Sequence, residues 1–327
     1  MSNEINYHPA RVAIIGAGNV GTTFAFTLLQ SGLASEIVLI DANYGKAEGE
    51  AIDLNHAMQL SQPTRIWAGS YADCQGAAIT VVTAGSAQKP GETRLDLIQR
   101  NLAIFEKIIP EVVRYNPNGI LLIATNPVDV LSYASWKISG LPSEKVIGSG
   151  TVLDTARFRY LISQKAGVDP RSVHAYIIGE HGDSEVPVWS LANIAGMPLK
   201  VFCDYNCTDL SDKVLDDIYT ETRDAAQRII QLKGATYYAI ANGLLKIVEA
   251  ILRDQNTVLS VSTLIDDYYD IHNRYLSLPC VIGRNGVKHF LRLNLNQKES
   301  EGLQNSAKVL GGIIQQTNLN EFSAVNG

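Results

Sequence analysis

A histidine in the Gly-Glu-His-Gly-Asp segment at residues 179–183 is the clearest candidate for chemistry in this chain. The ordinary pKa of histidine lets His181 donate or accept a proton near neutral pH. An Asp-Thr-Ala-Arg segment at 154–157 precedes it. Asp154 could fix the tautomer of the imidazole, and Arg157 could grip a carboxylate through two parallel hydrogen bonds. Together these residue types predict proton transfer on a substrate that carries a carboxylate group.

A Gly-Ala-Gly-Asn-Val-Gly segment at 16–21 follows a short apolar strand expected at 12–15 and precedes a helical run. In such a unit the first glycine permits a tight turn, the second lets the backbone approach a pyrophosphate, and the third lets the helix pack on the strand. Taken alone, the motif also fits an ordinary structural turn. In this context it predicts a dinucleotide site formed by Gly16, Gly18, Asn19, Val20 and Gly21.

Asp41 lies about twenty residues beyond this motif, at the end of the next expected strand. There its carboxylate can accept hydrogen bonds from both ribose hydroxyls and would repel a 2′-phosphate, which favours NAD over NADP.

Asn126 follows another apolar strand, and ligands of open α/β sheets bind beyond the carboxyl ends of strands. By itself Asn126 also fits a helix cap or a turn before Pro127. A dinucleotide site and an acid–base site in one chain predict hydride transfer.

The elements that must position these residues alternate regularly between Arg11 and Gly148. Apolar strands are expected at 12–15, 36–40, 64–67, 78–82, 119–124 and 145–147, with helical runs between them. This alternation is typical of βαβ units and a parallel sheet, and strands that are nearly all apolar indicate helices on both faces. One long polar connection, 85–96, interrupts the pattern, and connections of that length are usually functional or disordered.

Beyond Gly150 the pattern changes to α+β. We expect a helix at 152–167, a strand at 173–178, hairpin strands within 186–194, helices at 209–232 and 235–253, short β pieces between 257 and 293, and a final helix at 297–316. The sequence thus predicts an α/β chain of two domains. A Rossmann-type doubly wound parallel sheet would bind NAD at 8–149, and an α+β domain at 150–327 would bind the substrate.

Length and composition narrow the functional classes. With 327 residues, of which 46% are hydrophobic and 18% charged, the chain is long enough for two domains and too apolar for disorder. A net charge of −6 without a basic stripe argues against nucleic-acid binding. Residues 1–10 lack the apolar core of a signal peptide, and no apolar run is long enough to cross a bilayer. We therefore expect a cytoplasmic protein that does not bind membranes.

The cysteines are too few and too scattered for a disulfide scaffold: Cys74, Cys203, Cys207 and Cys280. Cys203 and Cys207 alone have metal-like spacing, but no second pair or nearby histidine cluster completes a four-ligand site. Glu180 and Asp183 beside His181 also fall short of a ligand set. We therefore expect reduced thiols and no metal.

Several longer blocks, in order along almost the whole chain, resemble the L-lactate dehydrogenase family and in particular its bacterial members. The blocks are Thr-Ala-Gly at 83–85, Gln-Lys-Pro-Gly-Glu-Thr-Arg-Leu-Asp-Leu at 88–97, Thr-Asn-Pro-Val-Asp at 125–129, Gly-Ser-Gly-Thr at 148–151, Leu-Asp-Thr-Ala-Arg at 153–157 and the 179–183 segment. The resemblance implies reversible reduction of pyruvate to L-lactate with NAD as cofactor, in fermentative regeneration of NAD. It also implies a homotetramer.

The resemblance assigns a role to each catalytic candidate. His181 would protonate the ketone oxygen of pyruvate as hydride arrives from NADH, and Asp154 would hold the imidazole in one tautomer. Arg157 would bind the substrate carboxylate in a bidentate manner. Arg94, on a mobile loop, would stabilise the negative charge that develops on the ketone oxygen.

The resemblance also covers the residues around these groups. Gln88, Asn126 and Thr236 would complete the substrate pocket, and Thr83, Ala84, Gly85 and Asn126 would contact the cofactor. Singly, such residues also have structural explanations. An isolated histidine is usually structural, an Asp and an Arg three apart on a helix usually form a surface pair, and a threonine at a helix start is often a cap. Their joint arrangement with the nucleotide motif favours catalysis.

Gln88 decides the expected substrate. Malate dehydrogenases share this architecture, and members that accept oxaloacetate carry an arginine at the matching position, where it pairs with the second carboxylate. The neutral amide of Gln88 cannot offset a buried carboxylate, whose unpaired burial costs several kcal/mol. Pyruvate is therefore expected, with malate dehydrogenase as the alternative. A non-catalytic NAD-binding sensor would need His181, Arg157 or Arg94 to be missing, and all three are present.

Arg159 and His174 suggest regulation. Arg159 follows Arg157 by two positions, a rotation of about 200° on a helix, so the two side chains should point to opposite sides. In bacterial lactate dehydrogenases that fructose 1,6-bisphosphate activates, an arginine and a histidine at the matching positions bind the sugar phosphates across a subunit interface. The resemblance implies the same effector here. The alternative is a solvent-facing arginine and a half-buried histidine without that role.

Overall fold

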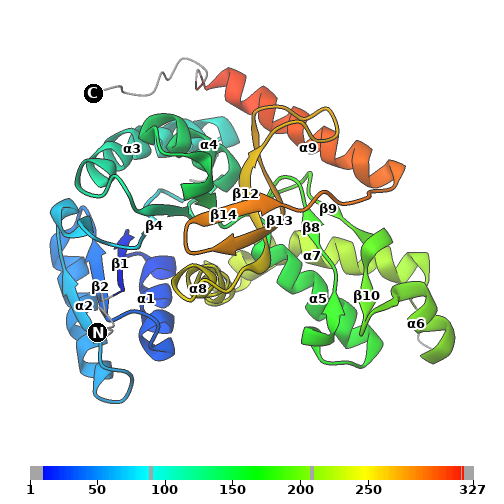
Figure 1. Cartoon of the computed structure of the whole chain (residues 1–327), viewed down its shortest axis with the longest axis horizontal. Helices are drawn as coiled ribbons and strands as arrows, with labels where there is room; N and C mark the ends of the chain where they lie inside the picture. Colours follow the sequence, from blue (N-terminus) through cyan, green and yellow to red (C-terminus); the bar gives the residue numbers. More distant parts are fainter. Residues whose placement is uncertain (1–9, 88–90, 207–209, 318, 320–327) are drawn as a thin grey trace, which may run out of the picture.

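The computed structural model describes residues 10–87, 91–206, 210–317 and 319, and its first half contains a doubly wound parallel sheet (Figure 1). The parallel strands are β1 (Arg11–Ile15), β2 (Glu36–Ile40), β3 (Arg65–Ala68), β4 (Ile79–Val82), β5 (Ile120–Ile123) and β6 (Val146–Gly148). They lie in the order β6-β5-β4-β1-β2-β3, so the strand order reverses between β1 and β4. The predicted Rossmann-type fold is confirmed. Ligands of such sheets bind where the order reverses.

Four helices connect these strands: α1 (Asn19–Ser31), α2 (Tyr44–Met58), α3 (Arg94–Tyr115) and α4 (Val128–Ser139). β4 and β5 are buried along their whole length, as expected for strands covered on both faces. α1 begins directly after the glycine-rich loop and ends at Gly32, whose φ of 65° is the left-handed conformation that favours glycine. The glycine-rich loop therefore lies at the carboxyl end of β1, beside the reversal point.

The helix α3 begins earlier than predicted, so the connection expected at 85–96 is shorter. The hydroxyl of Thr93 donates to the Asp96 carboxylate at 2.6 Å and accepts the Asp96 N–H at 3.2 Å. A Thr-x-x-Asp capping box is a recognised helix-start signal and could have placed this boundary. Arg94 therefore lies in the first turn of a helix, and the prediction that it lies on a loop is wrong.

Three antiparallel strands extend the same sheet beyond β6: β12 (Thr257–Ile265), β13 (Arg274–Gly283) and β14 (Gly286–Phe290). β12 pairs with β6 where Ser262 lies opposite Gly148, so within the described residues nine strands form one sheet. The prediction of only short β pieces here is wrong. Ser260, Ser262 and Ser277 interrupt the apolar runs, but they are buried and hydrogen-bonded, so they mark positions inside the strands and not strand ends.

A second, smaller core lies to the right in Figure 1, around α5 (Val152–Ala166), α6 (Leu199–Asn206) and α7 (Asp212–Lys233). Its buried side chains include Phe158, Ile162, Phe202 and Ile218. Short strands complete it in two small sheets: β7 (Val173–His174), β10 (Asn193–Ile194) and β11 (Met197–Pro198) in one, β8 (Ile177–Ile178) and β9 (Val186–Pro187) in the other.

The expected hairpin within 186–194 is wrong. β9 pairs with β8, β10 pairs with β7 and β11, and a 3₁₀ turn, η4 (Trp189–Leu191), separates them. The ring of Trp189 packs edge-on against Phe158 with the centroids 4.5 Å apart, and the hydroxyl of Ser190 donates to Glu299 at 2.6 Å. Contacts distant in sequence therefore direct the two strands to different partners.

The remaining helices are α8 (Tyr238–Leu252) and α9 (Gln297–Gln316), and α9 has the predicted bounds. α8 lies beside α1, so a helix from the second half packs against the first helix of the nucleotide half (Figure 1). Further 3₁₀ turns are η1 (Tyr71–Cys74), η2 (Ser143–Lys145) and η3 (Pro170–Ser172). In the described part of the chain, no helix combines the length and apolar character needed to cross a membrane.

Candidate active site

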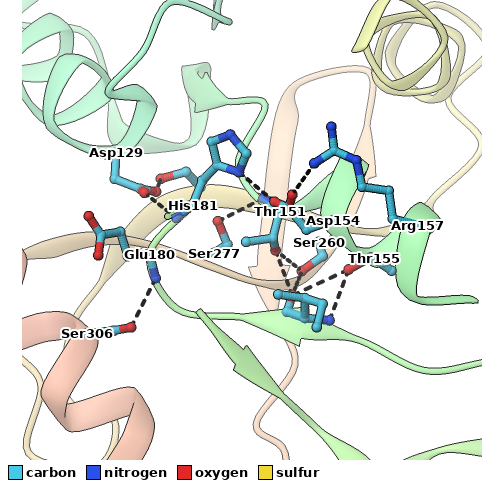
Figure 2. A network of polar contacts seen from close by, with 12 residues as sticks. Asp129, Thr151, Asp154, Thr155, Arg157, Glu180, His181, Ser260, Ser277 and Ser306 are labelled. Carbon is cyan, nitrogen blue, oxygen red and sulfur yellow. Dashed lines mark hydrogen bonds and ion pairs between the residues drawn. The ribbon is translucent and has the colours of Figure 1, made fainter. Parts of the chain in front are cut away.

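His181 and Asp154 lie side by side although they are 27 positions apart. The Nδ1 atom of His181 is 2.5 Å from Oδ2 of Asp154, whose exposed fraction is 2%. The Nη1 atom of Arg157 donates to the other carboxylate oxygen at 3.0 Å. Figure 2 shows the imidazole and the guanidinium directed to the same side of the shared carboxylate. Asp154 therefore orients together a group that can transfer a proton and a group that can bind a carboxylate.

Buried hydroxyl groups hold the start of α5, and with it Asp154, in place. Thr151 donates to the carbonyl oxygen of Ile177 at 2.6 Å, and Thr155 accepts the N–H of Ile177 at 3.0 Å. Ser260 of β12 donates to the same carbonyl at 2.8 Å. These bonds fix α5 to β8, the strand that leads to the histidine (Figure 2). Sequence reasoning missed them because an isolated threonine or serine carries no signal of its partner.

The charges around His181 favour its protonated form. Burial alone would lower the pKa of His181, but the Asp154 carboxylate, with Asp129 and Glu185, raises it to about 9. Burial would also raise the pKa of Asp154, yet His181 and Arg157 hold it below its ordinary value. At neutral pH the site therefore contains an imidazolium beside a carboxylate, a pair that can donate a proton.

Arg157 has a hydrogen-bond donor that the protein leaves unused. Its Nη2 atom is buried, and among the described residues it meets no acceptor. Leaving a buried donor unpaired costs about 1–3 kcal/mol, and more for a charged group, so such donors are normally matched by a partner. The carboxylate of a small substrate is the partner that a guanidinium binds best.

Arg94 is also close to this site, but it contacts a different carboxylate. Its guanidinium forms an ion pair with Glu180, the residue before His181. Glu180 is 1% exposed, and it also accepts the hydroxyl of Ser184 at 2.5 Å. Sequence reasoning gave Glu180 no role, because its importance depends on the approach of α3. Within the described residues, Arg94 does not hydrogen-bond to His181 itself.

The glycine-rich loop has the three properties that a pyrophosphate site requires. A Cβ atom at Gly21 would lie 2.0 Å from the carbonyl oxygen of Gly16, so helix and loop touch there. Gly16 itself has a φ of +108°. A Cβ at Gly18 would meet nothing within 4 Å among the described residues, so the backbone is open to a ligand. α1 begins at Asn19, followed by Val20, and no side chain of the described residues caps this end of the helix. The first N–H groups of the helix are therefore left for an anion.

Asp41 lies beside the same loop at the end of β2. Its Oδ2 atom accepts the N–H of Ala17 at 2.7 Å, and its Oδ1 atom accepts the N–H of Asn43 at 2.9 Å. Each carboxylate oxygen keeps a lone pair for a ribose hydroxyl. Its negative charge disfavours a 2′-phosphate. These residues therefore fit NAD.

Residues 83–85 and Asn126 border the same end of the sheet. The hydroxyl of Thr83 donates to the carbonyl of Gly16 at 2.9 Å. Gly85 follows Ala84, and a Cβ atom added to Gly85 would lie 2.3 Å from the methyl group of Thr125. The 83–85 segment therefore packs closely against Gly16 of the glycine-rich loop and against Thr125, the residue before Asn126.

Asn101 of α3, which sequence reasoning missed, holds Asn126 in place. Its amide donates to the carbonyl of Asn126 at 2.9 Å and accepts the N–H of Ser86 at 2.8 Å. The Asn126 side chain is exposed and can reach a ligand. An asparagine inside a helix usually faces solvent, so nothing in the sequence indicated that Asn101 is fully buried.

Two residues predicted to line the pocket, Gln88 and Thr236, are not connected to His181 by any hydrogen bond described above. Gln88 lies outside the described residues. Thr236 lies between α7 and α8, and the residue at the N-cap of α8 is Tyr237, so Thr236 does not cap that helix.

Arg159 and Arg157 point to different partners, as their spacing on α5 predicts. The Nε atom of Arg159 donates to the carbonyl of Ala175 at 2.8 Å, and its guanidinium lies 5.0 Å from the ring centre of Tyr176. His174, on β7, is exposed.

Models of two protein-family domains match almost the whole chain. The lactate/malate dehydrogenase NAD binding domain matches residues 10–148, and the lactate/malate dehydrogenase alpha/beta C-terminal domain matches residues 151–320. The chain belongs to the lactate/malate dehydrogenase family. The predicted family and the predicted NAD cofactor are therefore confirmed.

Relatives within the lactate/malate dehydrogenase family are similar over nearly their full lengths. L-lactate dehydrogenase 1 of Clostridium acetobutylicum is 50% identical over 92% of this chain and 96% of its own. L-lactate dehydrogenase of Acetivibrio thermocellus is 52% identical over 93% and 96%. Among solved structures, a lactate dehydrogenase from a Medee basin deep-sea metagenome library has a TM-score of 0.92 and 45% identity, covering 95% of this chain and 99% of its own.

Proposed function

We propose that this chain is an NAD-dependent L-lactate dehydrogenase that reduces pyruvate to L-lactate and catalyses the reverse reaction. The observation that carries the proposal is the shared carboxylate of Asp154, which holds His181 at 2.5 Å and Arg157 at 3.0 Å. This arrangement places a proton donor next to a carboxylate-binding group. The relatives named L-lactate dehydrogenase support this activity over that of a malate dehydrogenase.

In the reduction, His181 donates its proton to the ketone oxygen of pyruvate. NADH, when bound, supplies the hydride that reduces the ketone carbon. Asp154 keeps the imidazole protonated beforehand and fixes its ring orientation, since the two are bonded at Nδ1 and the other nitrogen is left to face the substrate. In the oxidation of lactate the neutral imidazole takes the proton back.

Arg157 binds the substrate carboxylate with N–H groups that include the buried, unpaired Nη2. Arg94 stabilises the charge that develops on the ketone oxygen, for which it must exchange Glu180 for the substrate. Asn126 positions the substrate, and Thr236 lines the pocket. Gln88, with its neutral amide, favours a monocarboxylate over oxaloacetate.

We extend the proposal to activation by fructose 1,6-bisphosphate in a cytoplasmic homotetramer. Arg159 lies on the face of α5 opposite Arg157, and His174 is exposed on β7, the strand that precedes Ala175. A bisphosphate that these two residues bind would act through α5 on Arg157. These statements rest on the resemblance and on that placement.

One assay tests the central proposal. Pyruvate and NADH are mixed with the enzyme, and the loss of nicotinamide absorbance is followed, with oxaloacetate as the comparison substrate. We expect rapid oxidation of NADH with pyruvate and slow oxidation with oxaloacetate. His181→Asn should abolish turnover while NADH still binds, because the nucleotide loop is separate from the histidine. A faster reaction with oxaloacetate would favour the malate dehydrogenase alternative.

A further inference from the structure

Asp129 is a buried acid that the mechanism above does not use. It is the second residue of α4, and its exposed fraction is 2%. Its Oδ2 atom accepts the backbone N–H of His181 at 2.8 Å, and its Oδ1 atom accepts the hydroxyl of Ser262 at 2.6 Å. The partners are 52 and 133 positions away along the chain. One carboxylate therefore joins α4, β12 and the segment that holds the histidine.

These bonds serve the histidine segment and not the helix that carries Asp129. An acid in the first turn of a helix commonly interacts with the free N–H groups of that helix. Here both oxygens bond to residues of other elements. Figure 2 shows the Asp129 carboxylate at the main chain of His181, whereas Asp154 meets the imidazole. Asp129 thus fixes the main chain of His181 and Asp154 fixes its imidazole. Together the two acids determine the direction of the histidine side chain.

The charge of Asp129 acts in the same sense as that of Asp154. Burial raises the pKa of Asp129 to about 6, although the bonds from Ser262 and His181 lower it, so the group is ionised above that pH. Asp129 is also among the charges that raise the pKa of His181. The other titratable or charged groups around the histidine are Asp154 and Arg157 of α5, Glu180 with its partner Arg94 of α3, and Glu185, whose own pKa burial raises to about 8.

We propose that Asp129 is a positioning residue of the dehydrogenase: it holds the main chain of His181 so that the imidazole meets Asp154, and its negative charge stabilises the protonated imidazole. This inference rests on the proposed function, because it concerns the proton that His181 donates to pyruvate. Ser262 supports Asp129, since its hydroxyl bond favours the ionised carboxylate.

The variant Asp129→Asn separates the charge from the hydrogen bond, because the amide oxygen can still accept the N–H of His181. We expect NMR titration of histidine-labelled enzyme to show the pKa of His181 lowered by on the order of one unit. The alkaline fall in kcat/KM for pyruvate should move to lower pH by the same amount, with NADH affinity unchanged. Asp183→Asn is the matched control, because Asp183 is an exposed acid two positions from the histidine, and it should shift neither titration.

Ser262→Ala is a second test that keeps Asp129 and applies if Asp129→Asn does not fold. Without the hydroxyl, Asp129 loses the bond that anchors its second oxygen, so it should hold the main chain of His181 less firmly. The imidazole should then meet Asp154 less well, and the pKa of His181 should again fall, by less. Variants with a lower melting temperature and an unchanged His181 titration would show a merely structural role and overturn the proposal. A wild-type enzyme that reduces no pyruvate would contradict the proposed function, whereas the His181 titration would still decide the role of Asp129.

Discussion

The guanidinium of Arg94 forms an ion pair with the carboxylate of Glu180, the residue that immediately precedes His181. Arg94 is the first residue of α3, and its guanidinium reaches the segment that contains His181. Its side chain is 43% exposed, while that of Glu180 is 1% exposed. The arginine is therefore the partner that is free to move, and Glu180 holds it one residue from the place where we propose that it acts.

Replacing Arg94 by Gln should reduce kcat for pyruvate by on the order of a hundredfold, because the developing charge on the ketone oxygen loses its stabilising cation. The melting temperature should also fall, since Glu180 would keep its burial and lose its partner. Arg94→Lys should preserve the melting temperature better than it preserves kcat. Arg100→Gln is the control, because Arg100 lies on the same helix and pairs with Glu92 instead. Unchanged turnover in Arg94→Gln would remove Arg94 from the mechanism.

The pKa of about 9 at His181 gives opposite pH dependences to the two directions. Pyruvate reduction needs the imidazolium, so its kcat/KM should fall as pH rises through about 9. Lactate oxidation needs the neutral imidazole, so its kcat/KM should rise over the same range. Asp154→Asn removes the carboxylate that raises this pKa, and both transitions should move to lower pH. Profiles of the wild type and this variant that coincide would contradict the assignment of Asp154.

Arg157→Lys keeps a positive charge but loses the planar fork that suits a carboxylate. We expect KM for pyruvate to rise by on the order of ten- to a hundredfold, which corresponds to the loss of a charged hydrogen bond. The dissociation constant of NADH, measured by its fluorescence on binding, should not change. Near-normal rates at low pyruvate would show that another group binds the carboxylate.

Gln88→Arg should raise kcat/KM for oxaloacetate relative to that for pyruvate, because the new cation can pair with the second carboxylate. Gln88→Ala is the control, since it removes the amide without adding charge. Parallel assays with the two oxo acids check this prediction. An unchanged ratio in Gln88→Arg would show that this side chain does not face the substrate.

Fructose 1,6-bisphosphate should lower the pyruvate concentration that gives half-maximal rate, and Arg159→Gln should abolish this effect without lowering the rate at saturating pyruvate. Arg171→Gln is the matched control, because Arg171 is highly exposed and pairs with Asp169. Pyruvate saturation curves that superimpose with and without the effector, at acidic and at neutral pH, would exclude the regulation.

Local sequence signals predicted the parallel sheet well. Each β strand from β1 to β6 lies within a residue or two of its expected range, because its apolar run is short, continuous and bounded by polar residues. The dinucleotide loop was recognisable for a similar reason, since Gly16, Gly18 and Gly21 are needed by local geometry. Resemblance to a family supplied the roles proposed for Arg94 and Thr236, which no spacing rule indicates.

The contacts that hold the histidine could not be predicted in this way. Asp129, Ser260 and Ser262 act through partners far away in sequence, and a buried serine in a strand reads as a polar interruption. Trp189 likewise redirects two short strands through Phe158. Such residues gain their roles only when the whole chain is folded.

The pairing of β12 with β6 has a consequence for how this chain can be divided. A fragment that ended at residue 149 would present the edge of β6 with no neighbour and would uncover the side of α1 that α8 covers. Open edges of buried parallel strands invite pairing with other chains, so such a fragment should aggregate on expression and not accumulate as a nucleotide-binding module.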